Sequence, residues 1–431
     1  MEHLSEPTSV SERLAAVLAP VLGPVDVEDL HRLSGGASRE TWSFRANGRA
    51  PILRRDPPGR PGAPGSMRLE ADAMRACRRA RLAAPDVLVD DDGGVLGTAG
   101  LVMAHVDGET LARKILRDDA YARARENLVH DLGRFLAGLH AIDPKEVPGA
   151  HEVDTLSQYW TAYGVVDDTS PTFERTYDWL IANRPARNAT TIVHGDLRLG
   201  NVIVDDTGLA AAIDWELVHL GDPLEDLAWL CVKAWRFGAR LEVGGVGTVD
   251  QLIEAYEGAG GRTVDRDAFH WWLVQKTLQW GVGCMGQAAV HLNGSVRSHE
   301  LAAIGRRVAE QEWDLIELLA PDEWRAARDA PLPEPLADVA GLYGRPTARE
   351  ILFAVREYLT EDVMPSTTGR LSFHARVAAN MLAVVERELA QPPVAHDGDD
   401  WASLARAVRI KLAVANPKHL QASTPNAGRA R

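Results

Sequence analysis

One stretch of this chain, TIVHGDLRLGNVIV at residues 191–204, limits the possible folds more than any other. Its flanking runs, "TIV" and "NVIV", are rich in β-branched residues and typical of short strands. The residues between them, from His194 to Gly200, then form a polar loop that the strands hold in place. Loops on a rigid scaffold often carry binding and catalytic residues. We therefore expect the functional site of this protein at this loop.

Composition excludes several classes of protein. A length of 431 residues predicts two or three domains, and an apolar content of 45% is ordinary for a globular protein with sizeable cores. The formal net charge of -14 argues against a nucleic-acid binder, which usually has a basic face. Because the sequence shows no export signal and no apolar run of about 18 residues, we expect a cytoplasmic protein without a membrane span. Its 3 widely spaced cysteines indicate neither a zinc site nor a disulfide framework.

The periodicity of apolar residues changes along the chain. The N-terminal part alternates like strands around one helical segment at residues 66–83, and the following part is mostly helical. A proline-rich stretch predicts a linker, and three amphipathic segments after it predict a separate helical module that we expect to pack or form a homodimer. The sequence thus predicts an α+β protein. The predicted divisions are a nucleotide-binding lobe at 1–105, a helical lobe at 106–330, a linker at 331–345 and a three-helix domain at 346–431.

The polar loop has the spacing that phosphoryl transfer needs. In protein kinases a catalytic-loop aspartate accepts the proton of the substrate hydroxyl, and an asparagine five residues later holds a magnesium ion. Asp196 and Asn201 have this spacing, and the strand AAIDWE supplies a second magnesium ligand, Asp214. The loop alone has an equally good structural explanation, because Asp, Gly and Asn all favour turns. Its combination with AAIDWE and an upstream glycine loop favours the catalytic interpretation.

In these motifs the chain resembles the aminoglycoside phosphotransferase and choline kinase-like family, relatives of the protein kinases. The resemblance rests on HGDLRLGN, IDWE and GDPLEDLAW, and loosely covers residues 28–320. LSGGASRETW and LRRDPPG look most like phosphotransferases associated with acyl-CoA dehydrogenases, and the last module resembles an uncharacterised helical domain that accompanies some of them. The resemblance implies a bilobal protein-kinase-like fold, with a small antiparallel-sheet N-lobe and a mainly helical C-lobe, and a small all-α C-terminal domain.

The resemblance also implies roles for the acidic loops. Asp196 would orient or deprotonate the acceptor hydroxyl, while Asn201 and Asp214 would hold Mg²⁺ on the phosphates of ATP. His194 and Arg198 belong to the same catalytic loop. We expect His194 to brace this loop through hydrogen bonds rather than to exchange protons.

Three acids near these loops have weaker assignments. Glu216 is either a further neighbour of the metal or a surface acid, and the sequence favours neither. Asp222 and Asp226 are typical of loop and helix-cap supports, so we expect them to be structural.

The N-terminal lobe would bind the nucleotide. The positions assigned to it are Ser34, Gly35, Gly36, Ser38, Arg54, Glu70, Met103, Ala104 and Val106. The small residues would let backbone N–H groups cover the phosphates, although hairpin tips use the same residues. Arg54 stands where related kinases have a lysine, with Glu70 as its expected ion-pair partner. Arginine binds phosphate through a planar, bidentate guanidinium group, whereas lysine acts as a point charge. Arginine in place of lysine therefore bears on the rate of phosphoryl transfer. The alternative for Arg54 is a solvated strand edge.

The acceptor is the least determined part of the prediction. The late helices line the acceptor pocket in the family, which implies Trp280 as a substrate contact, although an aromatic stripe at helical spacing is more often core. The finer resemblance favours a hydroxyacyl-CoA-like metabolite over an aminoglycoside or choline. A hypothesis from another class is a catalytically weak, kinase-shaped nucleotide-binding module that serves as a protein-interaction scaffold.

Overall fold

The computed structural model describes residues 6–33, 39–392 and 398–422. It divides into two compact units, of which unit 1 contains Met1–Val153 and Ala186–His270, and unit 2 contains Asp154–Pro185 and Trp271–Arg431. Each unit therefore combines segments that are far apart in the sequence. The four consecutive divisions predicted from the sequence do not include this interleaving, and their boundaries stay predictions.

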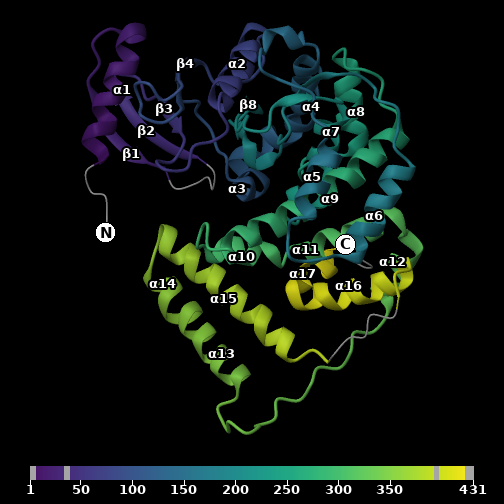
Figure 1. Cartoon of the computed structure of the whole chain (residues 1–431). Coiled ribbons are helices and arrows are strands. Elements are labelled where there is room, and N and C mark those ends of the chain that lie inside the picture. The colour runs from purple at the N-terminus through teal and green to yellow at the C-terminus, as the bar shows by residue number, and fades with distance from the viewer. Residues whose placement is uncertain (1–5, 34–38, 393–397, 423–431) are drawn as a thin grey trace. The chain divides into compact units, whose positions relative to one another are not determined.

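The N-terminal part of unit 1 is a five-stranded antiparallel sheet in the order β1-β2-β3-β5-β4 (Figure 1). Its strands are β1 (Val27–Arg32), β2 (Glu40–Ala46), β3 (Ile52–Arg55), β4 (Val87–Asp91) and β5 (Gly100–Met103). On β2, the buried Trp42 and Phe44 alternate with the less buried Ser43 and Arg45. This alternation matches the strand period in the sequence.

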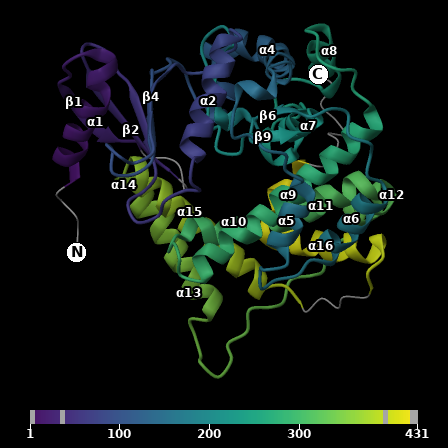
Figure 2. The ribbon, with the colours of Figure 1, turned by 45° about the horizontal axis from the view of Figure 1, so that its top comes forward.

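Two helices cover opposite faces of this sheet, as Figures 1 and 2 show. α1 (Glu6–Leu22) shares an apolar core with Leu53 of β3. α2 (Ser66–Arg79) presents Glu70, which lies 3.7 Å from the guanidinium of Arg54 on the same strand. Because successive residues of a strand point to opposite faces, the apolar Leu53 enters the core under α1 while its neighbour Arg54 turns toward α2.

The rest of unit 1 is mostly helical. It contains α3 (Ala112–Arg117), α4 (Ala122–His140), α7 (Leu224–Cys231), α8 (Val249–Gly258), β6 (Thr191–Val193), β7 (Val202–Val204), β8 (Leu209–Ala212) and β9 (His219–Gly221). The runs predicted as strands on either side of the polar loop are β6 and β7, and this prediction is confirmed. They belong to different two-stranded ribbons, since β6 pairs with β9 and β7 with β8. The polar loop thus connects two ribbons.

Unit 2 is built from helices in the part of the chain that is described. They are α5 (Thr155–Tyr163), α6 (Pro171–Ala182), α9 (Arg266–Leu292), α10 (His299–Gly305), α11 (Val308–Leu319), α12 (Pro321–Asp329), α13 (Ala348–Glu357), α14 (Met364–Ser366), α15 (Gly369–Leu389), α16 (Trp401–Ala415) and α17 (Pro417–Ala422). The first residues of α9 belong to unit 1. With the antiparallel sheet of unit 1, these helices confirm the predicted α+β class.

The last predicted helix packs differently from the sequence-based grouping. We grouped α16 with α13 and α15 in one three-helix module. In the structure, Leu404 and Leu412 of α16 share an apolar core with Trp313 of α11 and Trp324 of α12. α11 and α12 bury the apolar face of α16 because they present large apolar side chains to it. The periodicity of a single segment cannot show which helices will cover its apolar face.

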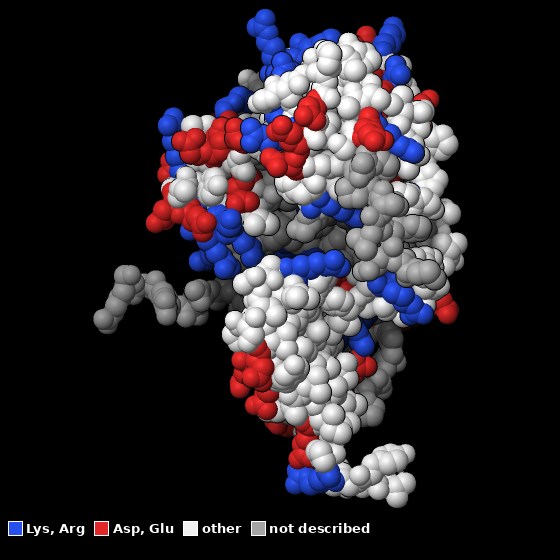
Figure 3. Space-filling model, turned by 90° about the vertical axis from the view of Figure 1, so that its left-hand side faces the viewer, with Lys and Arg blue, Asp and Glu red and all other residues white. Residues whose placement is uncertain are grey.

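α13 and α15 lie side by side and leave apolar side chains exposed. Arg356 of α13 forms a bidentate ion pair with Glu386 of α15, with distances of 2.8 and 3.0 Å. The exposed large apolar side chains on this pair include Ile351, Phe353, Val355, Leu371 and Phe373. Figure 3 shows a largely uncharged surface over these helices. Among the described helices, none is both long and apolar enough to cross a bilayer.

Candidate active site

The backbone of the polar loop is held by one buried carboxylate, that of Asp226 on α7. Asp226 accepts hydrogen bonds from the backbone N–H groups of His194 (2.8 Å) and Gly195 (2.9 Å), and from the ring of His140 (3.3 Å). Burial opposes its ionisation, but these donors hold the pKa of Asp226 below its usual value. Gly195 has a φ of +81°, and a Cβ there would lie 2.5 Å from the Leu217 carbonyl oxygen, so this turn requires glycine.

The ring of His194 connects the polar loop to the strand that carries Asp214. Its Nε2 donates to the Ile213 carbonyl at 3.1 Å, and its Nδ1 accepts from the Asp196 N–H at 3.3 Å. Burial lowers the pKa of His194, which favours the neutral ring. With both nitrogens engaged by backbone groups, His194 is placed as a positioning residue, as the sequence analysis expected.

Asp214 follows this connection directly and has an unusual backbone. Its φ is +67°, in the left-handed region that non-glycine residues seldom adopt. The preceding residue, Ile213, is fixed on both sides, because its N–H also donates to the Asn201 carbonyl at 3.0 Å. Strained backbone of this kind is maintained only where surrounding contacts enforce it, and it is concentrated at functional sites. The structure therefore brings Asp214 next to the polar loop in a constrained conformation.

Asp196 lies among donors from three sources. Asn201 Nδ2 donates to Asp196 Oδ2 at 2.6 Å, and the indole N–H of Trp229 donates to Oδ1 at 2.8 Å. Arg198 Nε also contacts Oδ1, at 3.2 Å, while its guanidinium lies 4.8 Å from the ring centre of Trp235. These contacts fix the orientation of the carboxylate before any substrate binds, which is what a positioned base requires.

Burial and neighbouring charge both affect the acidity of Asp196. Burial raises its pKa to about 6; Arg198 opposes this shift and Asp214 adds to it. Because the charge of Asp214 raises the pKa of Asp196, the two carboxylates are close enough to repel, and a cation between them would relieve the repulsion. The electrostatics of the loop therefore favour a bound cation.

Arg54 joins the two parts of unit 1 at this site. One of its guanidinium nitrogens lies 2.5 Å from Asp214 Oδ1 and 3.2 Å from Glu216 Oε2, and another lies 3.7 Å from Glu70 Oε2. Burial alone would lower the pKa of Arg54, but the three carboxylates together raise it. The ion pair with Glu70 predicted from the sequence is present. The additional contacts with Asp214 and Glu216 exclude a solvated strand edge.

The residues predicted to hold magnesium offer suitable atoms. Asn201 uses its amide nitrogen toward Asp196, and its carbonyl oxygen is a hard ligand of the kind that Mg²⁺ prefers. Asp214 supplies carboxylate oxygens, and its side chain is 30% exposed. The donor set of these two residues fits a magnesium ion.

The remaining predicted residues belong to other segments of the chain. Ser34, Gly35, Gly36 and Ser38 lie outside the described residues. Met103 ends β5, and the N–H of Ala104 donates to the Asp86 carbonyl at 2.8 Å, so it is not available to an adenine ring. Val106 lies three residues after Met103, in the connector that leaves the sheet. Trp280 belongs to α9 in unit 2, where it stacks with the guanidinium of Arg307.

Sequence reasoning missed two residues that the structure places here. Asp226 supports the polar loop, as the sequence analysis expected, through hydrogen bonds from the loop backbone. Trp229 and His140 had no assignment, yet one contacts Asp196 and the other contacts Asp226. Trp229 lies with Asp226 in GDPLEDLAW, one of the motifs that carry the resemblance to the family, so this motif could have pointed to Trp229.

Comparisons with known proteins identify relatives of parts of this chain. Acyl-CoA dehydrogenase family member 10 of Mus musculus is 30% identical over 227 residues, which are 49% of this chain and 20% of that protein. Acyl-CoA dehydrogenase family member 11 of Gallus gallus is 24% identical over 387 residues, which are 82% of this chain and 48% of that protein. The chain thus spans less than half the length of these two relatives.

Solved structures support the fold. A crystal structure from Ralstonia eutropha, named for the aminoglycoside phosphotransferases, matches with a TM-score of 0.56 and 21% identity, and covers 70% of this chain and 97% of that one. This likeness confirms the predicted protein-kinase-like fold. Residues 365–406 match a domain of unknown function, DUF6285, in agreement with the uncharacterised helical domain predicted for this end of the chain. Residues 29–272, more than half of the chain, match the phosphotransferase enzyme family, and the protein therefore belongs to that family.

Proposed function

We propose that this protein transfers the γ-phosphoryl group of ATP, bound with Mg²⁺, to a hydroxyl group of a small molecule. The observation that carries the proposal is the clustering of Asp196, Asn201 and Asp214 around one connection between two ribbons. These are the base and the two metal ligands that phosphoryl transfer by a kinase requires. Arg54, at hydrogen-bond distance from Asp214, adds a cation for the phosphates.

In the proposed reaction the chain mainly positions groups and balances charge. Asp196 accepts the proton of the acceptor hydroxyl as the new O–P bond forms and the bond to ADP breaks. Asn201 and Asp214 would hold Mg²⁺, which when bound neutralises charge on the phosphate oxygens. Arg54 would exchange part of its contact with Asp214 for contact with phosphate, a pairing its fork geometry suits. No covalent enzyme intermediate is needed.

We propose a hydroxyacyl-CoA-like metabolite as the acceptor. The relatives named acyl-CoA dehydrogenase family members support this choice over an aminoglycoside or choline. A CoA thioester carries phosphates, so its binding requires basic side chains near the acceptor position. Arg198, which is beside Asp196 and partly exposed, is one such side chain within unit 1.

The competing proposal is a catalytically weak nucleotide-binding scaffold. It is supported by the arginine at position 54, where related kinases have a lysine, and by the engagement of this arginine with three carboxylates. A scaffold of this kind would still bind nucleotide but would release little product.

Thermal unfolding with MgATP tests the nucleotide site. At a ligand concentration about 100 times the dissociation constant, binding to the folded state adds about 2.7 kcal/mol to its stability. We expect this stabilisation in the wild type and a clear loss of it in Asp214→Ala, because a metal ligand is removed. The matched control is Asp206→Asn, an exposed aspartate a few residues past Asn201, which should behave like the wild type. Equal shifts in wild type and Asp214→Ala would contradict the assignment of Asp214.

The pH dependence of the rate tests the role of Asp196. A base must be ionised, and burial raises the pKa of Asp196 to about 6. We expect kcat/KM for MgATP, which reports the free enzyme, to fall about tenfold per pH unit below that pKa. The residual activity of Asp196→Asn should not show this fall in kcat/KM at low pH. A wild-type profile that stays flat down to roughly pH 5 would contradict the role of Asp196 as base.

The exposed apolar side chains of α13 and α15 support a homodimer, which we propose to form through this pair. Ile351 is 51% exposed and Phe353 is 46% exposed. Replacing both with Asp should halve the mass measured by light scattering if this face joins two copies. Val165, an 82% exposed apolar residue in a different segment, provides the control variant Val165→Asp. A monomeric wild type, or a dimer that persists in the double variant, would exclude the proposal.

A further inference from the structure

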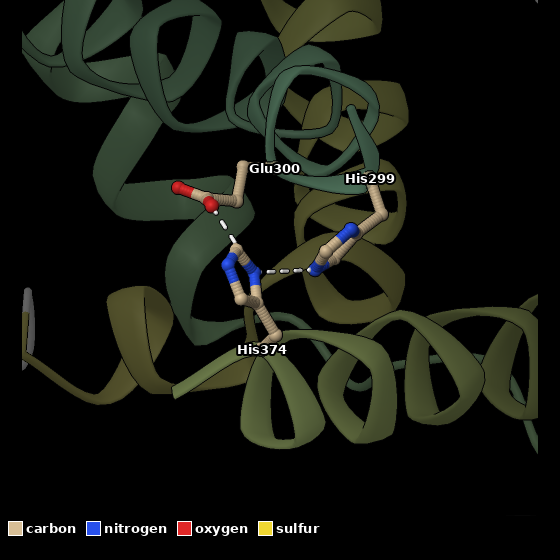
Figure 4. A group of neighbouring side chains, drawn as sticks. All are labelled: His299, Glu300 and His374. Atoms are coloured by element: carbon tan, nitrogen blue, oxygen red, sulfur yellow. Dashed lines mark hydrogen bonds and ion pairs between the residues drawn. The ribbon is translucent and has the colours of Figure 1, made fainter. Parts of the chain in front are cut away.

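A second cluster of ligand-type side chains lies in unit 2. Among the described residues, His299, Glu300 and His374 form a group whose ligand atoms all lie within 4.8 Å of one another (Figure 4). His299 and Glu300 begin α10, and His374 comes from α15. His374 Nδ1 is 3.0 Å from His299 Nε2 and 3.2 Å from Glu300 Oε1. Two elements thus direct three metal-binding side chains at one point.

The hydrogen bonds among these three side chains leave one acceptor without a donor. Arg370 Nε donates to His374 Nε2 at 2.8 Å, so Nε2 carries a lone pair and the hydrogen of the neutral ring is on Nδ1. That single hydrogen faces two acceptors, His299 Nε2 and Glu300 Oε1. One acceptor is therefore left without it at any moment. A cation at the same point serves all three ligand atoms.

We propose that His299, Glu300 and His374 bind a divalent transition-metal ion, and that Zn²⁺ is the ion their chemistry fits. Imidazole nitrogen and carboxylate oxygen bind zinc at about 2.0–2.2 Å, which places tetrahedral ligands roughly 3.3 Å apart. The two measured separations, 3.0 and 3.2 Å, are close to this value.

The cluster is accessible, and its location suggests what the ion does. The His374 and Glu300 side chains are 21% and 40% exposed, so an ion can enter and water can take a fourth position. A bound ion would join α10 to α15, the helix that contains much of the DUF6285 match at residues 365–406. We infer a cross-link that ties this helical segment to the rest of unit 2. This proposal is independent of the nucleotide site in unit 1.

Arg370 should oppose metal binding at this cluster. When Nδ1 of His374 binds a cation, the neutral ring must carry its hydrogen on Nε2, which cannot then accept from Arg370. Arg370 is an exposed residue and can turn away, but its positive charge and its hydrogen bond both oppose the ion. Removing the guanidinium should therefore strengthen metal binding, which is the opposite of the effect expected at a purely structural contact.

The experiment is a Zn²⁺ titration of the full chain by calorimetry after treatment with a chelator, in excess Mg²⁺ so that oxygen-ligand sites are occupied. We expect one equivalent of Zn²⁺ to bind the wild type. His374→Gln and His299→Gln should each lose more affinity than the roughly 10- to 100-fold that removal of an outer partner costs. Arg370→Gln should bind several-fold more tightly. The matched control, His31→Gln, replaces an exposed histidine of unit 1 and should leave affinity unchanged.

Two further measurements separate metal loss from misfolding. Circular dichroism of the metal-free variants should match the metal-free wild type. Co²⁺ in place of Zn²⁺ should give the visible absorption of a four-coordinate site in the wild type and Arg370→Gln, but not in His374→Gln. Equal Zn²⁺ affinity in wild type and His374→Gln, or weaker binding in Arg370→Gln, would overturn the proposal and leave the cluster as a hydrogen-bonded contact between helices.

Discussion

Asp196→Asn should reduce phosphoryl transfer by about 100- to 10,000-fold, the range that a positioned general base contributes. The asparagine side chain can still accept a hydrogen bond from Trp229 but cannot accept the proton of the acceptor hydroxyl. ADP formation with a panel of acceptors, beginning with hydroxyacyl-CoA species, measures the loss. Binding of MgATP should survive, because Asn201 and Asp214 remain.

The same variant should not unfold more easily at pH 8. Burial raises the pKa of Asp196 to about 6, above the value of 3.8 for an ordinary aspartate. The stabilisation of the folded state that follows from this pKa shift is fully present at a pH below 3.8, and it is lost as the pH rises through about 6. Asparagine removes a charge that the folded state disfavours at pH 8. A large fall in thermal stability there would attribute the lost activity to misfolding, and unchanged activity in a folded variant would favour the scaffold hypothesis.

Asp226→Ala should lower the free energy of unfolding by about 3 kcal/mol or more. Its carboxylate accepts from the N–H groups of His194 and Gly195 and from the ring of His140, and each buried donor left without an acceptor costs about 1–3 kcal/mol. Urea unfolding at pH 7 measures the change. Because the pKa of Asp226 lies below its usual value, the wild type should lose this stabilisation as the pH falls below 3.8, and the variant has none to lose.

Two variants separate this effect from a general loss of charge. Asp226→Asn keeps one acceptor oxygen and should fall between the wild type and Asp226→Ala. Asp206→Ala removes an exposed carboxylate and should change stability by less than about 0.5 kcal/mol. If Asp226→Ala were no more destabilised than Asp206→Ala, the polar loop would not depend on Asp226.

The features predicted from the sequence were those with a short-range signature. The alternation on β2 and the strands β6 and β7 follow from the strand period of two residues. The spacing of Asp196 and Asn201 is also local, since one loop carries both. The ion pair of Arg54 with Glu70 is a longer contact that the resemblance to a known family supplied.

Only the tertiary structure decided which segments that are far apart in the sequence come into contact. Asp226 reaches the backbone of His194 from 32 residues away, and Arg54 reaches Asp214 from 160 residues away. The core shared by α16 with α11 and α12, and the meeting of His374 with His299, depend in the same way on the path of the chain. Amphipathic periodicity shows that a helix has an apolar face but not which surface will bury it, because many surfaces can cover the same apolar face. The sequence alone thus determined the type of the local elements and the chemistry of the loop, whereas only the folded chain determined the partners of each side chain.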